Sequence, residues 1–408
     1  MRYYRYSEDW VSYLEGDFRE SLIAILRRLS FERLQKYPPP KLAGLPLGNE
    51  PRILSRFLRG RSSQLDASGF SGLYRSLMNE EQRLIYRAFR TNDFLTFDEW
   101  AAIITADNIP VWTSNKAIGA HANGKLRCQF SVVSLDGLVF AVEHMQDHGT
   151  VSEQQYVLDE PDDSSDDIQP FFHTYIGLDS LRMIEVMEKM TLPAAGRYLD
   201  CGPGSGSLLL YFGRRFDEAV GVDINPRAAV LAQFNADLNG LANVTVHADD
   251  ALSLADKYGR FDLVSWNLPF IFMPEEDGDN YIDGFGGELG IGLCLKFIET
   301  LPGLLTENGM ACVAAMAPIM QTGQNVLEAR LNEMLGPIGL DCEVRVEQLS
   351  VAHTRELWHF HKSRGLSKFE SVYLQLTHGS GRLTRIEAPF SRRAVDRLRE
   401  KMYTRKFA

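Results

Sequence analysis

Three glycines alternate with other residues in the segment Tyr198-Leu-Asp-Cys-Gly-Pro-Gly-Ser-Gly206, which includes a short apolar run at its start. A helical pattern follows at residues 207–216, so the glycines are predicted to join a strand to a helix. Glycine suits this position because the backbone must turn sharply and approach a ligand closely, with no Cβ in the way. The segment therefore predicts a nucleotide-type binding loop.

Short apolar runs recur on both sides of this loop and are separated by helix-like segments. The runs are residues 197–200, 219–223, 244–247, 261–266 and 311–315. Such alternation predicts a parallel sheet with helices on both faces, which is the α/β, Rossmann-like class of fold. Ligands of this class bind beyond the carboxyl ends of the strands, so the residues directly after each run are the candidates for a binding site.

The spacing of the glycine loop distinguishes between cofactors. Dinucleotide loops have the spacing G-x-G-x-x-G and direct amides of a helix N-terminus at a pyrophosphate. Here Gly202, Pro203, Gly204 and Gly206 form a G-x-G-x-G loop that an acid, Asp200, precedes. S-adenosylmethionine has no phosphate but carries an ammonium and a sulfonium, which a carboxylate attracts. The loop favours S-adenosylmethionine as the cofactor, with S-adenosylhomocysteine as the product.

An acid also ends the next apolar run. Asp223 follows Gly202 by 21 residues, where a carboxylate can accept hydrogen bonds from both ribose hydroxyls. Its neighbour Ile224 is assigned to the same cofactor site. The alternative is that Asp223 merely caps the helix that Pro226 begins.

Two further acids, Asp249 and Asp250, come directly after the third run. A carboxylate at this point can bind the adenine amino group, and we favour Asp250 for that role.

The fourth run ends in Asn267-Leu268-Pro269-Phe270, which places these residues in the predicted active-site crevice. The Asn267 side chain and the next carbonyl can both accept hydrogen bonds from a substrate N–H, and Phe270 can supply an aromatic wall. This arrangement would align a nitrogen for attack on a methyl group. The alternative is a plain ending of a strand in a turn.

Residues 170–320 resemble the class I S-adenosylmethionine-dependent methyltransferases, in particular the branch with an N-P-P-[FY] motif after the fourth strand. That branch methylates amino, amide or exocyclic nitrogens and includes the adenine and guanine N-methyltransferases and the release-factor glutamine methyltransferases. The resemblance implies a mainly parallel seven-stranded sheet. Leu268 departs from the motif because it replaces the first proline, which makes the loop less rigid and leaves Asn267 and the carbonyl in place.

Two more segments resemble parts of these enzymes. The segment Tyr175-Ile-Gly-Leu-Asp-Ser-Leu resembles one that closes over the cofactor, so Tyr175 is assigned to the cofactor site. The segment from Tyr281 to Gly290 resembles the usual successor of the motif. Together with the acid-rich residues 275–280, it provides the candidate substrate residues Glu275, Glu276, Tyr281 and Glu288. These acids would attract a cationic substrate, and a solvated loop is the alternative.

Residues 1–158 are predicted to form a mainly helical N-terminal domain with a β-hairpin. Apolar residues have helical spacing at 21–29, 52–58 and 81–89, and Thr96 with Glu99 matches a capping box. Asp136-Gly137 is a hairpin signal within the β-rich residues 125–144. Helices followed by a hairpin suggest a winged-helix-like module. Because the helix at residue 97 is acidic, we expect it to cover substrate or dock an acceptor rather than read a nucleic-acid groove.

The acidic residues 159–169 form the predicted linker, and residues 170–408 the methyltransferase domain. A formal net charge of −11 argues against a nucleic-acid partner. The five cysteines are scattered and predicted to be reduced. No membrane span or signal is recognised, so the expected location is cytoplasmic. His359 and His361 are read as lying on a strand and not as metal ligands, and no metal is predicted.

These patterns together predict an enzyme that methylates a nitrogen of a small molecule or an amino acid, whether amino, amide or guanidino. An RNA or protein N-methyltransferase is the alternative, with the N-terminal domain docking the macromolecule. A non-catalytic protein that only binds the cofactor is a third reading. The sequence leaves the acceptor and the oligomeric state open.

Overall fold

The computed structural model describes residues 10–29, 79–89, 92–120, 124–143, 174, 176–275, 284–350 and 355–387. The chain divides into two compact units. The first comprises residues 1–185, 204–211 and 225–246, and the second comprises residues 186–203, 212–224 and 247–408. The predicted linker at 159–169 and the predicted helix at 52–58 lie outside the described residues. No helix among the described residues is both long and apolar enough to cross a membrane.

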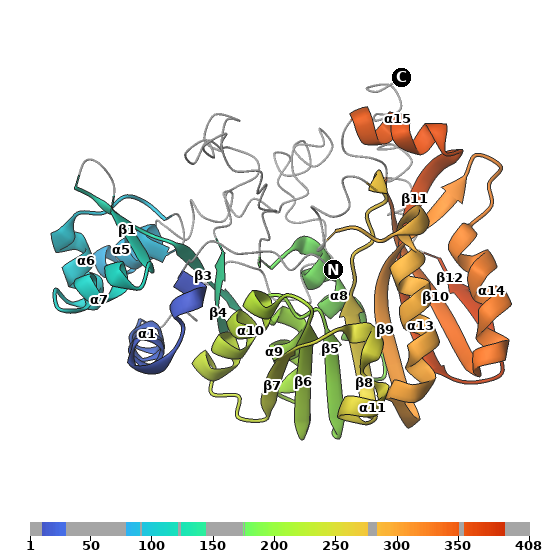
Figure 1. Cartoon of the computed structure of the whole chain (residues 1–408), viewed down its shortest axis with the longest axis horizontal. Coiled ribbons are helices and arrows are strands. Elements are labelled where there is room, and N and C mark those ends of the chain that lie inside the picture. Colours follow the sequence, from blue (N-terminus) through green and yellow to red (C-terminus); the bar gives the residue numbers. More distant parts are fainter. Residues whose placement is uncertain are drawn as a thin grey trace. The chain divides into compact units, whose positions relative to one another are not determined.

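An eight-stranded mixed sheet has the order β12-β10-β11-β9-β8-β5-β6-β7 (Figure 1). The strands are β5 (Arg197–Cys201), β6 (Glu218–Asp223), β7 (Val244–Ala248), β8 (Phe261–Asn267), β9 (Leu305–Met320), β10 (Leu340–Ser350), β11 (Leu366–His378) and β12 (Leu383–Ile386). All five predicted apolar runs are strands. The predicted count of seven was one short, because β12 adds an edge strand parallel to β10.

The directions of the strands explain where a ligand site can form. β5 is parallel to both β6 and β8, and β8 is parallel to β9, so these strands end at one edge of the sheet. β11 is antiparallel to its two neighbours β9 and β10. The predicted binding residues follow β5, β6 and β8 and therefore share the carboxyl edge of the parallel part.

Helices α13 (Gly292–Leu304) and α14 (Val326–Ile338) pack side by side against β9 (Figure 1). The apolar side chains between them and the sheet form the main core of the second unit, with Phe261, Phe297 and Leu331 fully buried. The same unit contains the short helices η4 (Ala251–Ser253), α11 (Ala255–Tyr258) and η5 (Glu288–Gly290), and α15 (Arg355–Ser363). Helices α8 (Leu178–Met187) and α9 (Ser207–Gly213) flank β5 in sequence.

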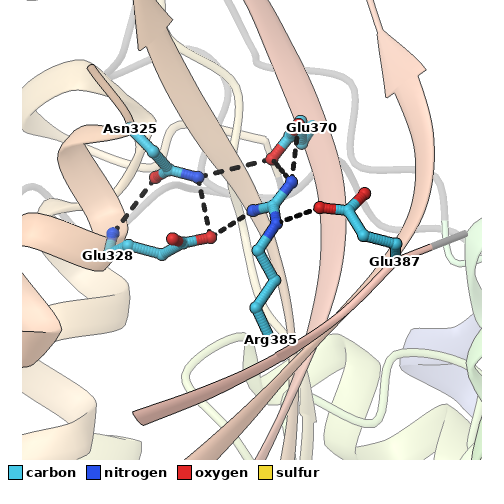
Figure 2. Close-up of polar contacts among 5 residues, drawn as sticks. All are labelled: Asn325, Glu328, Glu370, Arg385 and Glu387. Carbon is cyan, nitrogen blue, oxygen red and sulfur yellow. Dashed lines mark hydrogen bonds and ion pairs between the residues drawn. The ribbon is translucent and has the colours of Figure 1, made fainter. Parts of the chain in front are cut away.

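The added strand β12 is held by one arginine among three carboxylates (Figure 2). The Arg385 guanidinium donates to both carboxylate oxygens of Glu370 at 2.9 Å, and it also pairs with Glu328 and Glu387. Asn325 caps α14 through the Glu328 amide at 3.1 Å and donates to Glu370 at 3.3 Å. This network links β12 to β11 and to the start of α14, which explains how a four-residue edge strand keeps its place.

The first unit contains η1 (Trp10–Tyr13), α1 (Gly16–Arg28), α5 (Glu80–Phe89), α6 (Phe97–Ile104), α7 (Asn108–Ser114), β1 (Ile118–Ala120), β2 (Leu126–Cys128), β3 (Phe130–Leu135), β4 (Leu138–Glu143) and α10 (Pro226–Leu238). The predicted helices at 21–29 and 81–89 are confirmed as α1 and α5. The capping box is confirmed as well, because Thr96 and Glu99 each accept a hydrogen bond from the other's amide.

The predicted hairpin is confirmed as β3 and β4, which pair antiparallel. Its two turn residues, Asp136 and Gly137, both have positive φ angles of 50° and 82°. That is the pattern of a type I′ turn, whose twist matches that of the strands.

Helix α10 completes the core of this unit. Its residues Leu231, Phe234 and Leu238 are buried in one apolar cluster with large aromatic side chains of residues 10–130. Trp10, for example, packs edge-on against Phe234 with 6.4 Å between ring centroids. Arg27 of α1 donates to the Leu238 carbonyl at 2.9 Å and so caps the end of α10.

Candidate active site

Asp200 is oriented by a buried chain of hydroxyl groups. Ser265 on β8 donates to Asp200 Oδ1 at 2.6 Å, and Tyr198 Oη lies 2.6 Å from Ser265 Oγ. Burial raises the pKa of Tyr198 well above its usual value, so its hydroxyl stays protonated. Since Ser265 gives its only proton to the carboxylate, Tyr198 donates to Ser265. The chain therefore runs from Tyr198 through Ser265 to Asp200.

The register of the sheet brings these three groups together. Asp200 lies opposite Ser265 on the neighbouring parallel strand, and Tyr198 is two residues earlier on the same face of β5. Sequence reasoning found Asp200 but missed both hydroxyl residues. A polar residue at the corresponding position inside two predicted strands was the available signal.

The glycines of the loop are each required for a different reason. Gly202 has a φ of 60°, and a Cβ there would lie 2.9 Å from the Trp266 indole nitrogen. Gly204 has a φ of 56°, and a Cβ there would meet nothing within 4 Å. At Gly206 a Cβ would lie 2.8 Å from the Leu210 side chain. Pro203, between the first two, is buried. The open side of Gly204 suits a ligand that approaches the backbone.

Asp223 lies at the end of β6 and is buried, with 7% of the residue exposed. The alternative role as a helix cap is wrong, because Asn225 caps α10 by accepting from the Arg227 amide at 3.0 Å. Ile224, directly after Asp223, is one of the few large apolar side chains that are exposed, at 48%. A carboxylate beside an exposed apolar side chain suits a ligand that combines hydroxyls with a flat ring.

Asp249 and Asp250 differ in what occupies their carboxylates. Asp249 is bound by Lys257 at 2.8 Å and by the Tyr258 hydroxyl at 3.2 Å, and the Lys257 hydrogen bond is the main reason why its pKa is lowered. Asp250 uses Oδ1 to accept from the Leu252 amide at the start of η4. The Asp249 amide donates to the Asp223 carbonyl at 3.0 Å, which ties the two strand ends together.

The motif after β8 splits into buried and accessible residues. Asn267 is the last residue of β8 and is half-buried. Leu268 is only 1% exposed and its side chain packs in the apolar core, which leaves its backbone carbonyl as the group that the sequence assigns to the acceptor. Pro269 and Phe270 are half-buried beyond it. Leu268 therefore anchors the loop through packing.

The chain after the motif is held by backbone contacts to the segment at 284–290. The Ile271 amide donates to the Gly284 carbonyl at 2.6 Å, and the Gly286 amide donates to the Ile271 carbonyl at 3.0 Å. A Cβ at Gly290 would lie 2.6 Å from the Phe270 carbonyl oxygen. Glycine at residue 290 therefore allows this segment to lie close against the motif.

His361 holds the same loop from α15. Its ring Nε2 lies 2.8 Å from the Phe272 carbonyl, and the two rings stack with a 13° interplanar angle. The ring of Phe360 is also near Phe272, at 4.9 Å between centroids. The pKa of His361 is lowered, because the effect of burial is larger than the opposite effect of the hydrogen bond to Phe272. The histidines were predicted on a strand; they lie on a helix, so His359 is exposed and His361 is buried.

The candidate substrate acids are only partly described. Glu275 and Glu288 are both exposed, and Glu288 begins η5. Glu276, Tyr281 and the cofactor candidate Tyr175 lie outside the described residues.

No group of three metal-binding side chains occurs among the residues that the structure describes. All five cysteines are buried and free. Burial raises the pKa of Cys294 and Cys312 to about 12, so both remain protonated thiols.

Comparisons with known proteins show the family of this chain. A family model described as a methyltransferase domain matches residues 199–285. A provisionally assigned protein N5-glutamine methyltransferase of Methanocaldococcus jannaschii is 30% identical over 150 residues, which cover 36% of this chain and 71% of that protein. The chain belongs to the class I methyltransferases. Members of this class typically use S-adenosylmethionine.

Two further matches are a curated relative and a solved structure. A 2-heptyl-1-hydroxyquinolin-4(1H)-one methyltransferase of Mycobacteroides abscessus is 36% identical over 86 residues, which cover 21% of this methyltransferase and 38% of that one. The crystal structure of the ribosomal protein L11 methylase of Lactobacillus delbrueckii subsp. bulgaricus is 16% identical, with a TM-score of 0.32. The match covers 50% of this chain and 81% of that chain.

Proposed function

We propose that this methyltransferase transfers the methyl group of S-adenosylmethionine to a nitrogen of a small molecule or an amino acid. The observation that carries the proposal is the position of Asn267, which ends β8 at the carboxyl edge of the parallel strands. The buried Leu268 after it anchors the backbone, and the half-buried Pro269 and Phe270 follow. An amide oxygen and a carbonyl at this edge suit an acceptor that has an N–H group.

The residues at this edge also fit the cofactor. Asp200, held by its hydroxyl chain, is assigned to the cationic amino acid part of S-adenosylmethionine, and Asp223 to the ribose hydroxyls. Ile224 offers an exposed apolar surface to the adenine. Asp250 is the better candidate for the adenine amino group, because Lys257 and Tyr258 already bind the Asp249 carboxylate.

The proposed mechanism depends on positioning. S-adenosylmethionine supplies a methyl group that a sulfonium activates. Asn267 Oδ1 and the Leu268 carbonyl accept hydrogen bonds from the acceptor nitrogen and turn its lone pair toward the methyl group. Phe270 provides a flat wall beside the acceptor. Holding two reactants in line removes several kcal/mol from a bimolecular barrier, about 7–11 kcal/mol in favourable cases.

A second candidate acceptor is the side-chain amide of glutamine in a protein. The assigned activity of the archaeal relative favours it. In that case the N-terminal residues 1–158, which the sequence predicts to be winged-helix-like, would dock the acceptor protein. For a small acceptor, the same residues would cover the substrate. The net charge of −11 disfavours RNA in both cases.

The test is incubation of the full chain with methyl-labelled S-adenosylmethionine and cell extract fractionated by size. A small labelled product supports the first candidate, and a labelled protein that releases N5-methylglutamine on digestion supports the second. Label that stays on oxygen or carbon contradicts nitrogen methylation.

Two variants separate binding from transfer. Asp223→Ala should weaken the affinity for S-adenosylhomocysteine at least tenfold, because it removes charge-assisted hydrogen bonds of about 1.5–3 kcal/mol each. Asn267→Ala should abolish transfer and leave that affinity within about twofold. Unchanged affinity in Asp223→Ala would refute the cofactor assignment, and full transfer by Asn267→Ala would refute the acceptor assignment.

A further inference from the structure

The outer edge of β4 is covered by two asparagine side chains. Among the described strands β4 pairs only with β3, in a two-stranded sheet, so its other edge presents N–H and C=O groups that need partners. Asn239 accepts from the Val139 amide at 2.8 Å and donates to the Val139 carbonyl at 2.6 Å. Asn235 accepts from the Ala141 amide at 2.8 Å and donates to the Ala141 carbonyl at 2.9 Å.

The spacing of these residues explains the match. Asn235 lies on α10 and Asn239, four residues later, is the C-cap of that helix, which separates them by about 6 Å along the helix axis. Val139 and Ala141 are two residues apart on β4, which separates them by about 6.7 Å. Each amide therefore meets one residue of the edge and replaces the missing neighbouring strand.

The two asparagines differ in their remaining N–H group. Asn239 donates it to the Asn235 carbonyl of its own helix at 2.7 Å. Asn235 donates it to the Ser205 carbonyl at 2.8 Å, in the middle of the glycine loop. The Asn235 side chain is fully buried, both of its N–H groups donate, and its oxygen accepts one hydrogen bond.

The Ser205 carbonyl lies where the loop most needs a restraint. Its neighbours Gly204 and Gly206 have φ angles of 56° and 88°, and glycine is the residue with the greatest backbone freedom. The C=O and the following N–H of a trans peptide point in opposite directions. The hydrogen bond from Asn235 therefore also fixes the direction of the Gly206 N–H.

We propose that Asn235 is a positioning residue that links the N-terminal hairpin to the cofactor loop and holds that loop in its binding conformation. The inference rests on the proposed use of S-adenosylmethionine. It implies that the N-terminal residues contribute to cofactor affinity through Asn235, in addition to any contact with the acceptor.

The test compares Asn235→Ala with Asn239→Ala in the full chain, with S-adenosylhomocysteine as the probe in calorimetry. Both variants uncover the edge of β4 and should lower the melting temperature to a similar extent. Asn235→Ala should bind the probe about tenfold more weakly, which corresponds to about 1.4 kcal/mol. Asn239→Ala should stay within about twofold of the wild type. Equal affinities of the two variants would overturn the proposal.

A second pair of variants and a measurement on the unmodified chain cover the case in which Asn235→Ala does not fold. Asn235→Asp and Asn239→Asp keep the size of the side chain and lose both donors, and the same difference in affinity is expected. In the unmodified chain, S-adenosylhomocysteine should slow amide hydrogen exchange in β4 more than in β1 and β2, because coupling between sites is reciprocal. An unchanged β4 overturns the proposal. A wild type that does not bind the probe contradicts the proposed function instead.

Discussion

Replacing Ser265 by alanine tests whether the buried hydroxyl chain supports Asp200. The change removes the hydrogen bond to Asp200 Oδ1, and a bond to a charged group contributes about 1.5–3 kcal/mol. It also leaves the fully buried Tyr198 hydroxyl without its acceptor. An unsatisfied buried hydroxyl destabilises the folded state by about 1–3 kcal/mol. Because the two terms are not additive, Ser265→Ala is expected to lower the free energy of unfolding by about 3 kcal/mol.

Tyr198→Phe is the partner variant in a double-mutant cycle. It removes one neutral hydrogen bond and should cost about 1 kcal/mol. In the double variant no orphaned hydroxyl is left, so its cost should fall below the sum of the single costs by about 1 kcal/mol or more. Urea unfolding can be followed by tryptophan fluorescence, to which Trp266 in the same core contributes. The hydroxyl chain would be refuted if the loss of unfolding free energy in the double variant equalled the sum of the two single losses within about 0.3 kcal/mol. A loss below about 0.5 kcal/mol in Ser265→Ala would also refute it.

Three further predictions concern single side chains. Gly202→Ala should lower the free energy of unfolding by more than about 2 kcal/mol, because the backbone φ is near 60° and the added methyl group would meet Trp266. The same variant should bind S-adenosylhomocysteine more weakly. A melting curve that matches the wild type would contradict this prediction. Burial lowers the pKa of His361 in the folded chain, so the His361 ring binds a proton more tightly in the unfolded chain. The free energy of unfolding should therefore be unaffected by this histidine above about pH 6.5 and should fall at lower pH. Urea titrations at pH 7.5 and 5.5 should show a smaller loss in His361→Gln than in the wild type, and equal losses would contradict the assignment. Arg385→Ala should lower the free energy of unfolding, measured by urea titration, by about 1–3 kcal/mol, because three carboxylates lose a shared and partly buried partner. The control is Arg330→Ala, which removes an exposed ion pair with a 3.9 Å separation and should lower the free energy of unfolding by less than about 0.5 kcal/mol.

The parallel part of the sheet could be predicted because each of its strands is an apolar run bounded by polar or turn residues. The same reasoning failed at residues 359–361, where three residues were read as a strand. Leu357, Phe360 and His361 have the i, i+3, i+4 spacing of a helix face, and His361 is buried on that face. A longer window would have found α15. β12 has no such signal, because it is short and held by the charge network around Arg385.

The residues that follow strands could be predicted as site candidates from their positions alone. Asp200, Asp223 and Asn267 all lie at the carboxyl edge, as expected. Leu268 shows the limit of a linear motif, because its direction into the core depends on packing that the motif does not contain. Ser265 and Tyr198 were missed because the register between two strands decides which side chains meet, and apolar runs do not specify register.

A loop built for close contact with a ligand must be held by residues outside its own motif. Glycines allow the approach, but they also leave the peptide planes free to rotate. The Gly202 amide is held by the Val222 carbonyl at 2.7 Å, and the Ser205 carbonyl is held by Asn235 at 2.8 Å. A loop that is already restrained loses less conformational entropy when the ligand binds. A backbone carbonyl of the neighbouring strand β6 and an asparagine inside a helix hold the loop without any local sequence signature, so the glycine motif identifies the site but not the groups that hold it in shape.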